Sequence, residues 1–208
     1  MIDPDLPLAL ALALGLVSGF RHAFEPDHLV AVSTLVDGDR QWGRSVRLGL
    51  SWGAGHTTTL VLGVLVIGLL KLPVTEAALG WFELPVGLML VGLGVWTLRD
   101  AVWPREHAPA RTVEREGWAG YIVGLVHGMA GSGALLLLVA AALPTLAAGI
   151  GYALLYGLGS ILGMGAVTLA LSLPLRAARS QPVLFRLLIG VAGALSVALG
   201  GVLLSEML

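Results

Sequence analysis

The sequence predicts an all-α integral membrane protein with six transmembrane helices, arranged as a 3+3 inverted repeat. Three observations lead to this prediction: the composition, six hydrophobic blocks, and motifs that recur about half a chain apart. Of the 208 residues, 57% are hydrophobic and only 12% are charged, with a mean hydropathy of +0.90. A soluble domain carries roughly twice that charged fraction. The composition therefore argues against a soluble fold and excludes a disordered chain.

Two further features of the composition exclude whole classes of function. The net charge of −1 gives no reason to expect a nucleic-acid partner. The chain contains no cysteine, so disulfides, iron–sulfur clusters and thiolate metal sites are ruled out. The composition is that of a protein embedded in a lipid bilayer.

Six hydrophobic blocks are each long enough to cross a bilayer. The first is expected to remain in the mature protein, because the N-terminus (Met1-Ile2-Asp3-Pro4-Asp5) is acidic and unlike a signal peptide. The expected spans are 6–36, 46–70, 78–98, 118–142, 145–171 and 184–204.

The basic residues predict the orientation of these spans. Cytoplasmic connections of membrane proteins carry an excess of Lys and Arg. Ten of the twelve basic residues fall in the connections after spans one, three and five or within the first three residues of the next span, whereas Lys71 alone lies on the opposite face. Both termini are therefore expected outside. The ten are Arg40, Arg44, Arg47, Arg99, Arg105, Arg111, Arg115, Arg176, Arg179 and Arg186.

Short motifs recur about half a chain apart. The sequence 19–22 (Gly-Phe-Arg-His) matches 124–127 (Gly-Leu-Val-His), and 52–56 matches 156–160. Glu83 and Gly87 correspond in the same order to Arg186 and Gly190. These matches predict a first repeat over 1–98, a polar cytoplasmic connection over 99–117, and a second repeat over 118–208. Three spans per half invert the second half, an architecture typical of transporters.

Span one carries an unusual run of polar residues for a membrane helix. His22, Glu25, Asp27 and His28 surround Pro26, and ionisable groups within the bilayer are costly unless they have a function. Proline cannot donate to the carbonyl four residues earlier, so the helix should break near Pro26 and leave the His22 carbonyl without its helical partner. The break would let His22, Asp27 and His28 converge, which a regular helix forbids.

Imidazoles and a carboxylate without sulfur are ligands for borderline divalent ions such as Ni²⁺, Co²⁺, Cu²⁺ or Zn²⁺. His56, in span two, is the fourth candidate ligand beside His22, Asp27 and His28. Interhelical hydrogen bonding is the alternative role for these histidines. The secondary candidates are His127, Glu25 and Ser132, with Glu25 expected to pair with Arg21 rather than to bind the ion.

Three segments resemble the nickel/cobalt transporter family. His22-x4-Asp27-His28 is similar to the HX4DH signature of that family, and 55–60 (Gly-His-Thr-Thr-Thr-Leu) is similar to its second signature. The stretch 126–133 resembles the shorter six-span group that includes the urease accessory membrane protein H. The resemblance implies a carrier of Ni²⁺ or Co²⁺ in the bacterial inner membrane, with His22, Asp27, His28 and His56 handling the metal.

The expected function is therefore transport of a divalent cation as substrate, without a prosthetic group and without enzymatic activity. Uptake is favoured, because the membrane potential drives a cation inward. Two other functions use the same ligands: an intramembrane zinc metallohydrolase and a haem protein with paired histidines. A homo-oligomeric assembly and a metallochaperone partner both stay open.

Overall fold

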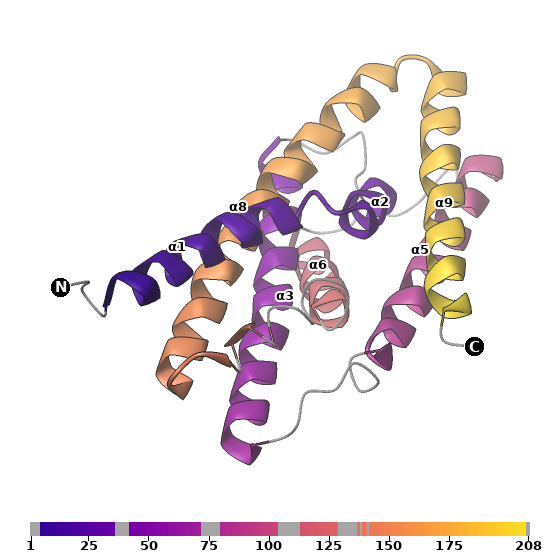
Figure 1. Cartoon of the computed structure of the whole chain (residues 1–208). Coiled ribbons are helices and arrows are strands. Elements are labelled where there is room, and N and C mark those ends of the chain that lie inside the picture. The colour runs from indigo at the N-terminus through magenta and orange to yellow at the C-terminus, as the bar shows by residue number, and fades with distance from the viewer. Residues whose placement is uncertain are drawn as a thin grey trace.

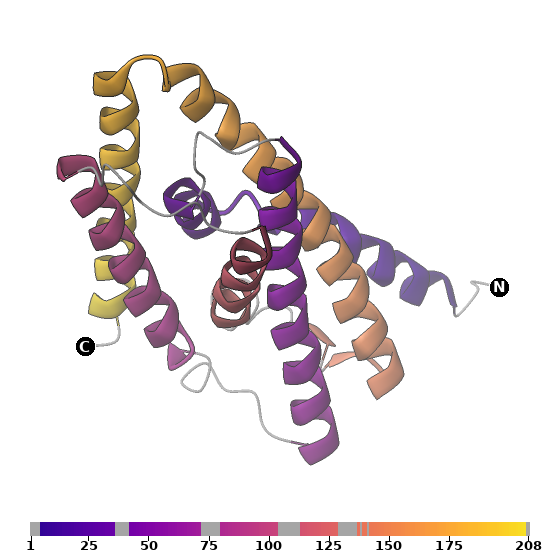
Figure 2. The same cartoon turned by 180° about the vertical axis from the view of Figure 1, so that it is seen from behind.

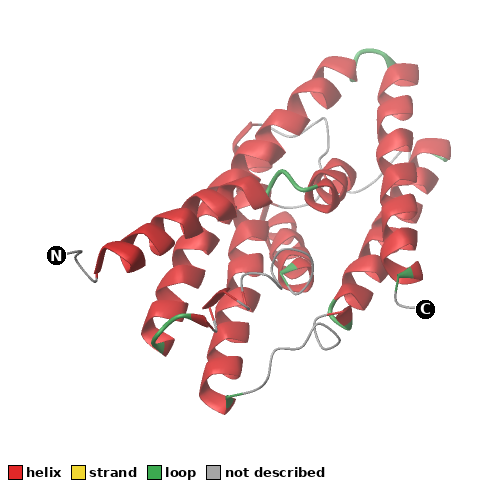
Figure 3. Cartoon of the chain, in the orientation of Figure 1, coloured by secondary structure: helices red, strands yellow, loops and turns green. Residues whose placement is uncertain are grey.

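A computed structural model describes residues 5–35, 42–71, 80–103, 113–128, 137, 139–140 and 142–206. Every regular element within these residues is helical (Figure 3). The chain is thus a helical protein of the membrane type that its composition predicts. Its main helices are α1 (Asp5–His22), α2 (Pro26–Leu35), α3 (Trp42–Leu70), α5 (Glu83–Val102), α6 (Val113–His127), α8 (Leu146–Ala178) and α9 (Pro182–Ser205).

Four of the described helices, α3, α5, α8 and α9, are long and apolar enough to cross a bilayer. The first expected span, 6–36, consists of two shorter helices, α1 and α2, on either side of the break before Pro26. Of the fourth, 118–142, α6 forms the part up to His127, and residues 129–136, 138 and 141 lie outside the described residues. α5 continues to Val102 and α6 begins at Val113, so both helices extend into the range expected for the polar connection, 99–117.

The predicted break in the first span is confirmed. Residues 23–25 form a turn between α1 and α2, and Pro26 is the first residue of α2, a position where its missing N–H costs nothing. The His22 carbonyl lacks its helical partner, as predicted, because Pro26 has no N–H to donate, but it is not left unpaired. The Glu25 N–H donates to that carbonyl at 3.0 Å, and the Phe24 N–H donates to the Arg21 carbonyl at 3.0 Å. A tighter turn thus replaces the lost helical bonds.

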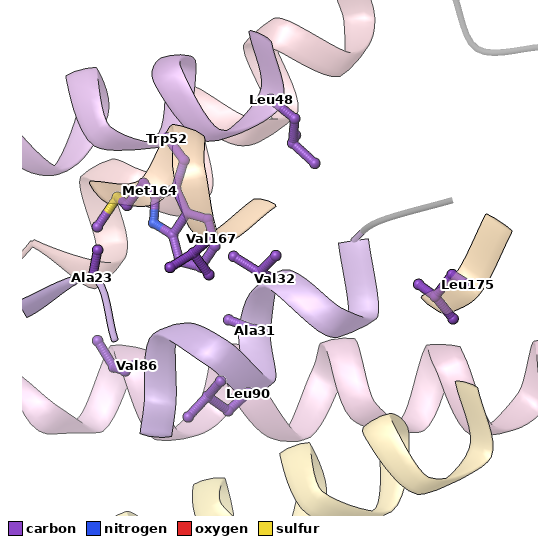
Figure 4. Close-up of a cluster of buried hydrophobic side chains, with 10 residues drawn as sticks. All are labelled: Ala23, Ala31, Val32, Leu48, Trp52, Val86, Leu90, Met164, Val167 and Leu175. Atoms are coloured by element: carbon purple, nitrogen blue, oxygen red, sulfur yellow. The ribbon is translucent and has the colours of Figure 1, made fainter. Parts of the chain in front are cut away.

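The helices form two groups with α2 between them (Figures 1 and 2). In the first group α8 packs against α1 and α3, and α3 also packs against α6; in the second, α5 pairs with α9. Figure 4 shows Ala31 and Val32 of α2 between Trp52 on one side and Leu90 on the other. Because α2 packs mainly against α9 and α5, it belongs more closely to the second group.

Glycines bring the backbones of the first group into direct contact. A Cβ on Gly19 would overlap the Tyr156 carbonyl in α8, and a Cβ on Gly124 would overlap the Trp52 carbonyl in α3. Each glycine therefore lies where only a hydrogen fits. Gly19 and Gly124 are 105 residues apart, and Trp52 and Tyr156 are 104 apart, so the two contacts recur at the spacing of the sequence motifs.

Candidate metal centre

Four buried histidines lie close together near the C-terminal ends of α1 and α6. His22 is the last residue of α1 and His127 is the last residue of α6. His28 lies in the first turn of α2, and His56 lies near the middle of α3. Their exposed fractions are between 0 and 2%. Four imidazoles from four helices are thus held together away from solvent.

The rings are in direct contact. The centroid of His28 lies 4.2 Å from that of His22 and 4.1 Å from that of His127. The His22 and His56 centroids are 4.7 Å apart, and those of His28 and His56 are 5.5 Å apart. The turn before Pro26 makes this possible, because it folds His28 back toward the end of α1. The predicted convergence of His22 and His28 is therefore present.

Asp27 lies between two of the imidazoles. Its Oδ1 accepts a hydrogen bond from Nδ1 of His28 at 3.0 Å, and its Oδ2 accepts one from Nε2 of His127 at 2.8 Å. A carboxylate that accepts from a ring nitrogen fixes both the tautomer and the orientation of that ring. Asp27 therefore holds His28 and His127 in defined positions.

The possible ligand atoms form two overlapping sets. His22, His28 and His56 offer donor atoms within 4.8 Å of one another, and so do Asp27, His28 and His127. The sequence grouped Asp27 with His22 and His56. The structure brings it instead to His127, which was predicted only as a secondary candidate.

Several ring nitrogens of this cluster have no hydrogen-bond partner among the described residues. They are Nε2 of His28, Nδ1 of His127 and both nitrogens of His56, all fully buried. A buried polar atom without a partner is costly, so such atoms call for an explanation. A metal ion would satisfy them, since neutral imidazole nitrogens are its common ligands.

The secondary candidates have different positions. The Glu25 carboxylate lies 3.0 Å from Nδ1 of His22. It therefore touches a candidate ligand, rather than serving only as the partner expected for Arg21. Ser132 lies outside the described residues.

Two aromatic residues that the sequence interpretation did not assign to the site flank the cluster. Trp52 stacks on His28, with centroids 5.7 Å apart and planes inclined by 8°, and its centroid lies 5.5 Å from that of His127. The ring centroid of Tyr156 lies 5.5 Å from that of His22. The two occupy corresponding positions in the recurring motifs at 52–56 and 156–160, which was the signal that could have identified them.

One relative matches nearly the whole chain. Urease accessory protein UreH from Bacillus sp. (strain TB-90) is 31% identical over 207 residues, which cover 94% of this chain and 91% of that protein. The chain belongs to the UreH family. No protein-family model and no solved structure matches this UreH-family chain.

Two plant proteins share part of their length with this UreH-family chain. Chloroplast proteins FOR GROWTH AND FERTILITY 1 and 2 of Arabidopsis thaliana are 29% identical over 173 residues and 28% identical over 167 residues. Each match covers 74% of this chain but only 47% and 45% of the plant proteins. The similarity thus spans less than half of either plant protein.

Proposed function

We propose that this chain carries a divalent transition-metal ion, Ni²⁺ or Co²⁺, across the bacterial inner membrane. The observation that carries the proposal is the buried cluster of four imidazoles, with four ring nitrogens that lack a hydrogen-bond partner within the described residues. Titratable groups at such a place in a membrane protein mark an ion pathway.

The donor chemistry supports the choice of ion. The cluster offers imidazole nitrogen and carboxylate oxygen but no sulfur, a combination suited to borderline divalent metals. The UreH-family relationship and the His22-x4-Asp27-His28 motif together favour Ni²⁺ or Co²⁺. On this proposal the chain is a member of the wider nickel/cobalt transporter family, with His22, Asp27, His28 and His56 as metal-handling residues and His127 beside them.

The membrane potential is sufficient to drive uptake. A divalent cation moving inward gains about 4.6 kcal/mol per 100 mV, twice the value for one elementary charge. The sequence contains no Gly-x4-Gly-Lys-Ser/Thr loop for nucleotide phosphates. We therefore assign the chain to secondary carriers or facilitators, with uptake favoured over export.

The helix packing supports an inverted repeat with residues 1–98 and 118–208 as its halves. Exchanging the halves turns the α1–α8 contact into the α6–α3 contact, and each of the pairs α3–α8 and α5–α9 into itself. Gly53 against Ile161 and Gly157 against Thr57 are a further pair of equivalent contacts. In inverted repeats one group of helices rocks against the other about a central site.

The cluster lies at the junction of the two helix groups. His22, His56 and His127 belong to the first group, whereas Asp27 and His28 belong to α2, which packs mainly against α9 and α5. Movement of α2 with α5 and α9 would separate ligands from one another and so release the ion. A carrier requires such a site, which forms and opens in each cycle.

Exposed tryptophans lie near both expected membrane interfaces, whereas the proposed orientation, with both termini outside, rests on the basic residues of the connections. Trp42, Trp103 and Trp118 are each more than half exposed near the basic connections, and Trp81 is 70% exposed near the opposite face. Exposed tryptophans at these depths anchor a protein at the membrane interfaces.

The alternative of an intramembrane zinc metallohydrolase has no support among the relatives. Flux measurements test transport directly. Wild-type protein in proteoliposomes should take up Ni²⁺ or Co²⁺ when the interior is negative, and His22→Ala, His28→Ala and His56→Ala should each lose at least nine-tenths of that flux. His107→Ala, in the polar connection, is the matched control. Wild-type flux in all three variants would overturn the assignment.

A further inference from the structure

We propose that the histidine cluster offers two alternative positions for one divalent transition-metal ion, which share His28 and differ in whether His22 or its equivalent in the internal repeat, His127, binds the ion. The first position is formed by His22, His28 and His56, and the second by Asp27, His28 and His127. This inference rests on the transport function proposed above and describes the path of the ion within the same site.

The surroundings of His28 are nearly symmetric. Its ring centroid lies 4.2 Å from His22 on one side and 4.1 Å from His127 on the other. These two histidines are the last residues of α1 and α6 and occupy corresponding positions, 105 residues apart. Each also lies 5.5 Å from an aromatic ring, Tyr156 for His22 and Trp52 for His127. His28 therefore lies between two equivalent imidazoles, each of which contacts an equivalent aromatic ring.

The donor atoms of the second position are close to coordination distances. Two atoms bound at about 2.1 Å to a tetrahedral ion are about 3.4 Å apart. The Asp27 oxygens lie 3.0 Å from Nδ1 of His28 and 2.8 Å from Nε2 of His127. An ion between them would displace the Nδ1 proton of His28 and the Nε2 proton of His127, each of which would move to the other nitrogen of its ring, and the donors would separate by only a few tenths of an ångström.

His28 can serve both positions without turning its ring. Nδ1 faces Asp27 and belongs to the second position, which leaves Nε2 for the first. An ion that moves between the positions exchanges Nε2 of His28 for Nδ1 of the same ring together with its other ligands. The short separation of the two positions matters, because a bare divalent ion in a low-dielectric interior would be very costly.

The two positions are not identical, because the second half lacks an imidazole equivalent to His56. Ser160 occupies that position and donates to the Gly19 carbonyl at 3.2 Å. Asp27 supplies the third ligand instead. The first position therefore has three neutral donors, whereas the second has a carboxylate that lowers the net charge of the bound ion by one.

Cobalt binding to the purified full-length protein tests this inference. His56→Gln disables the first position and His127→Gln disables the second. Each should still bind one Co²⁺ per chain, with visible absorption spectra that differ from each other, and should lose at least tenfold in flux. His28→Gln, and the double variant that combines His56→Gln with His127→Gln, should bind Co²⁺ at least 100-fold more weakly than wild type. His107→Gln is the matched control.

Two results would overturn the inference. His127→Gln with wild-type spectrum, affinity and flux would eliminate the second position, and His56→Gln without any bound Co²⁺ would leave a single site. If His127→Gln does not elute as a folded protein, His127→Asn replaces it, because its amide can still donate to Asp27. Failure of the transport proposal is distinguishable, since wild-type protein would then neither bind nor move the ion.

Discussion

Asp27 and His127, one hundred residues apart in the sequence, are joined by a hydrogen bond of 2.8 Å from the Nε2 of His127. The same carboxylate accepts from His28 at 3.0 Å. Asp27 therefore couples α2 to the end of α6 and orients two imidazoles at once.

Replacing Asp27 should weaken metal binding strongly. In Asp27→Asn the side chain retains only one oxygen and cannot accept from both rings. We expect Co²⁺ affinity to fall by about 10- to 100-fold, the usual effect of losing a carboxylate that orients histidine ligands. Asp100→Asn is the control, because Asp100 accepts from Trp96 at the end of α5. Wild-type affinity in Asp27→Asn, measured by Co²⁺ titration, would contradict this role.

Glu25→Gln should have a smaller effect in the same titration. Glu25 lies 3.0 Å from Nδ1 of His22, but its side chain is 35% exposed and it touches one imidazole rather than two. We expect an affinity loss of about three- to tenfold, with Glu206→Gln as the control. A loss equal to that of Asp27→Asn would mean that Glu25 itself binds the ion.

The internal repeat predicts matched consequences at Gly19 and Gly124. A methyl group at either position would overlap a carbonyl of the neighbouring helix, so each alanine variant should lose about 1–3 kcal/mol of unfolding free energy. Gly92→Ala should be neutral, because nothing lies within 4 Å of its Cβ position. Chemical denaturation of the three alanine variants in detergent measures their unfolding free energies. Tolerance at one of the two equivalent positions would argue against equivalent contacts.

Contacts between residues close together in the sequence could be predicted, whereas contacts between distant segments could not. The break before Pro26 is a local property of the backbone, so the separation of α1 from α2 and the approach of His22 to His28 were both predictable. The burial of the four histidines also followed from their places within apolar blocks.

The partners of Asp27 and Glu25 were not predictable, because they depend on how distant helices pack. Local spacing suggested that Glu25 pairs with Arg21, four residues earlier, whereas the turn over residues 23–25 brings its carboxylate to His22. Likewise, α6 ends at His127 although the apolar sequence continues. Hydropathy alone did not indicate that the helix ends there, and so left the histidine at its end among the secondary candidates.

The Arg44–Glu116 ion pair should stabilise the contact between α3 and α6. The Arg44 guanidinium donates to both Glu116 oxygens, at 3.2 and 2.9 Å, and the Glu116 side chain is only 8% exposed. Arg44→Ala should lower the unfolding free energy by about 2 kcal/mol, because it withdraws the guanidinium from a buried carboxylate. Arg47→Ala, which replaces an exposed arginine of α3, is the control. Exchanging the charges (Arg44→Glu with Glu116→Arg) should recover part of the loss, and no recovery would indicate that the pair contributes little.

The absence of cysteine makes the orientation testable without background labelling. Ser205→Cys at the end of α9 should react with a membrane-impermeant maleimide added to intact cells. Ser180→Cys, in the turn between α8 and α9, should react only after permeabilisation. The reverse pattern would show that the basic connections face outward.

X-ray absorption of the Co²⁺- or Ni²⁺-loaded protein tests most directly whether the ion rests on the histidine cluster. The account predicts a nitrogen and oxygen shell with the outer scattering of at least two imidazoles and no sulfur, and the loss of that imidazole signal in His28→Ala. A shell of oxygen alone in the wild type, or an unchanged imidazole signal in His28→Ala, would contradict it.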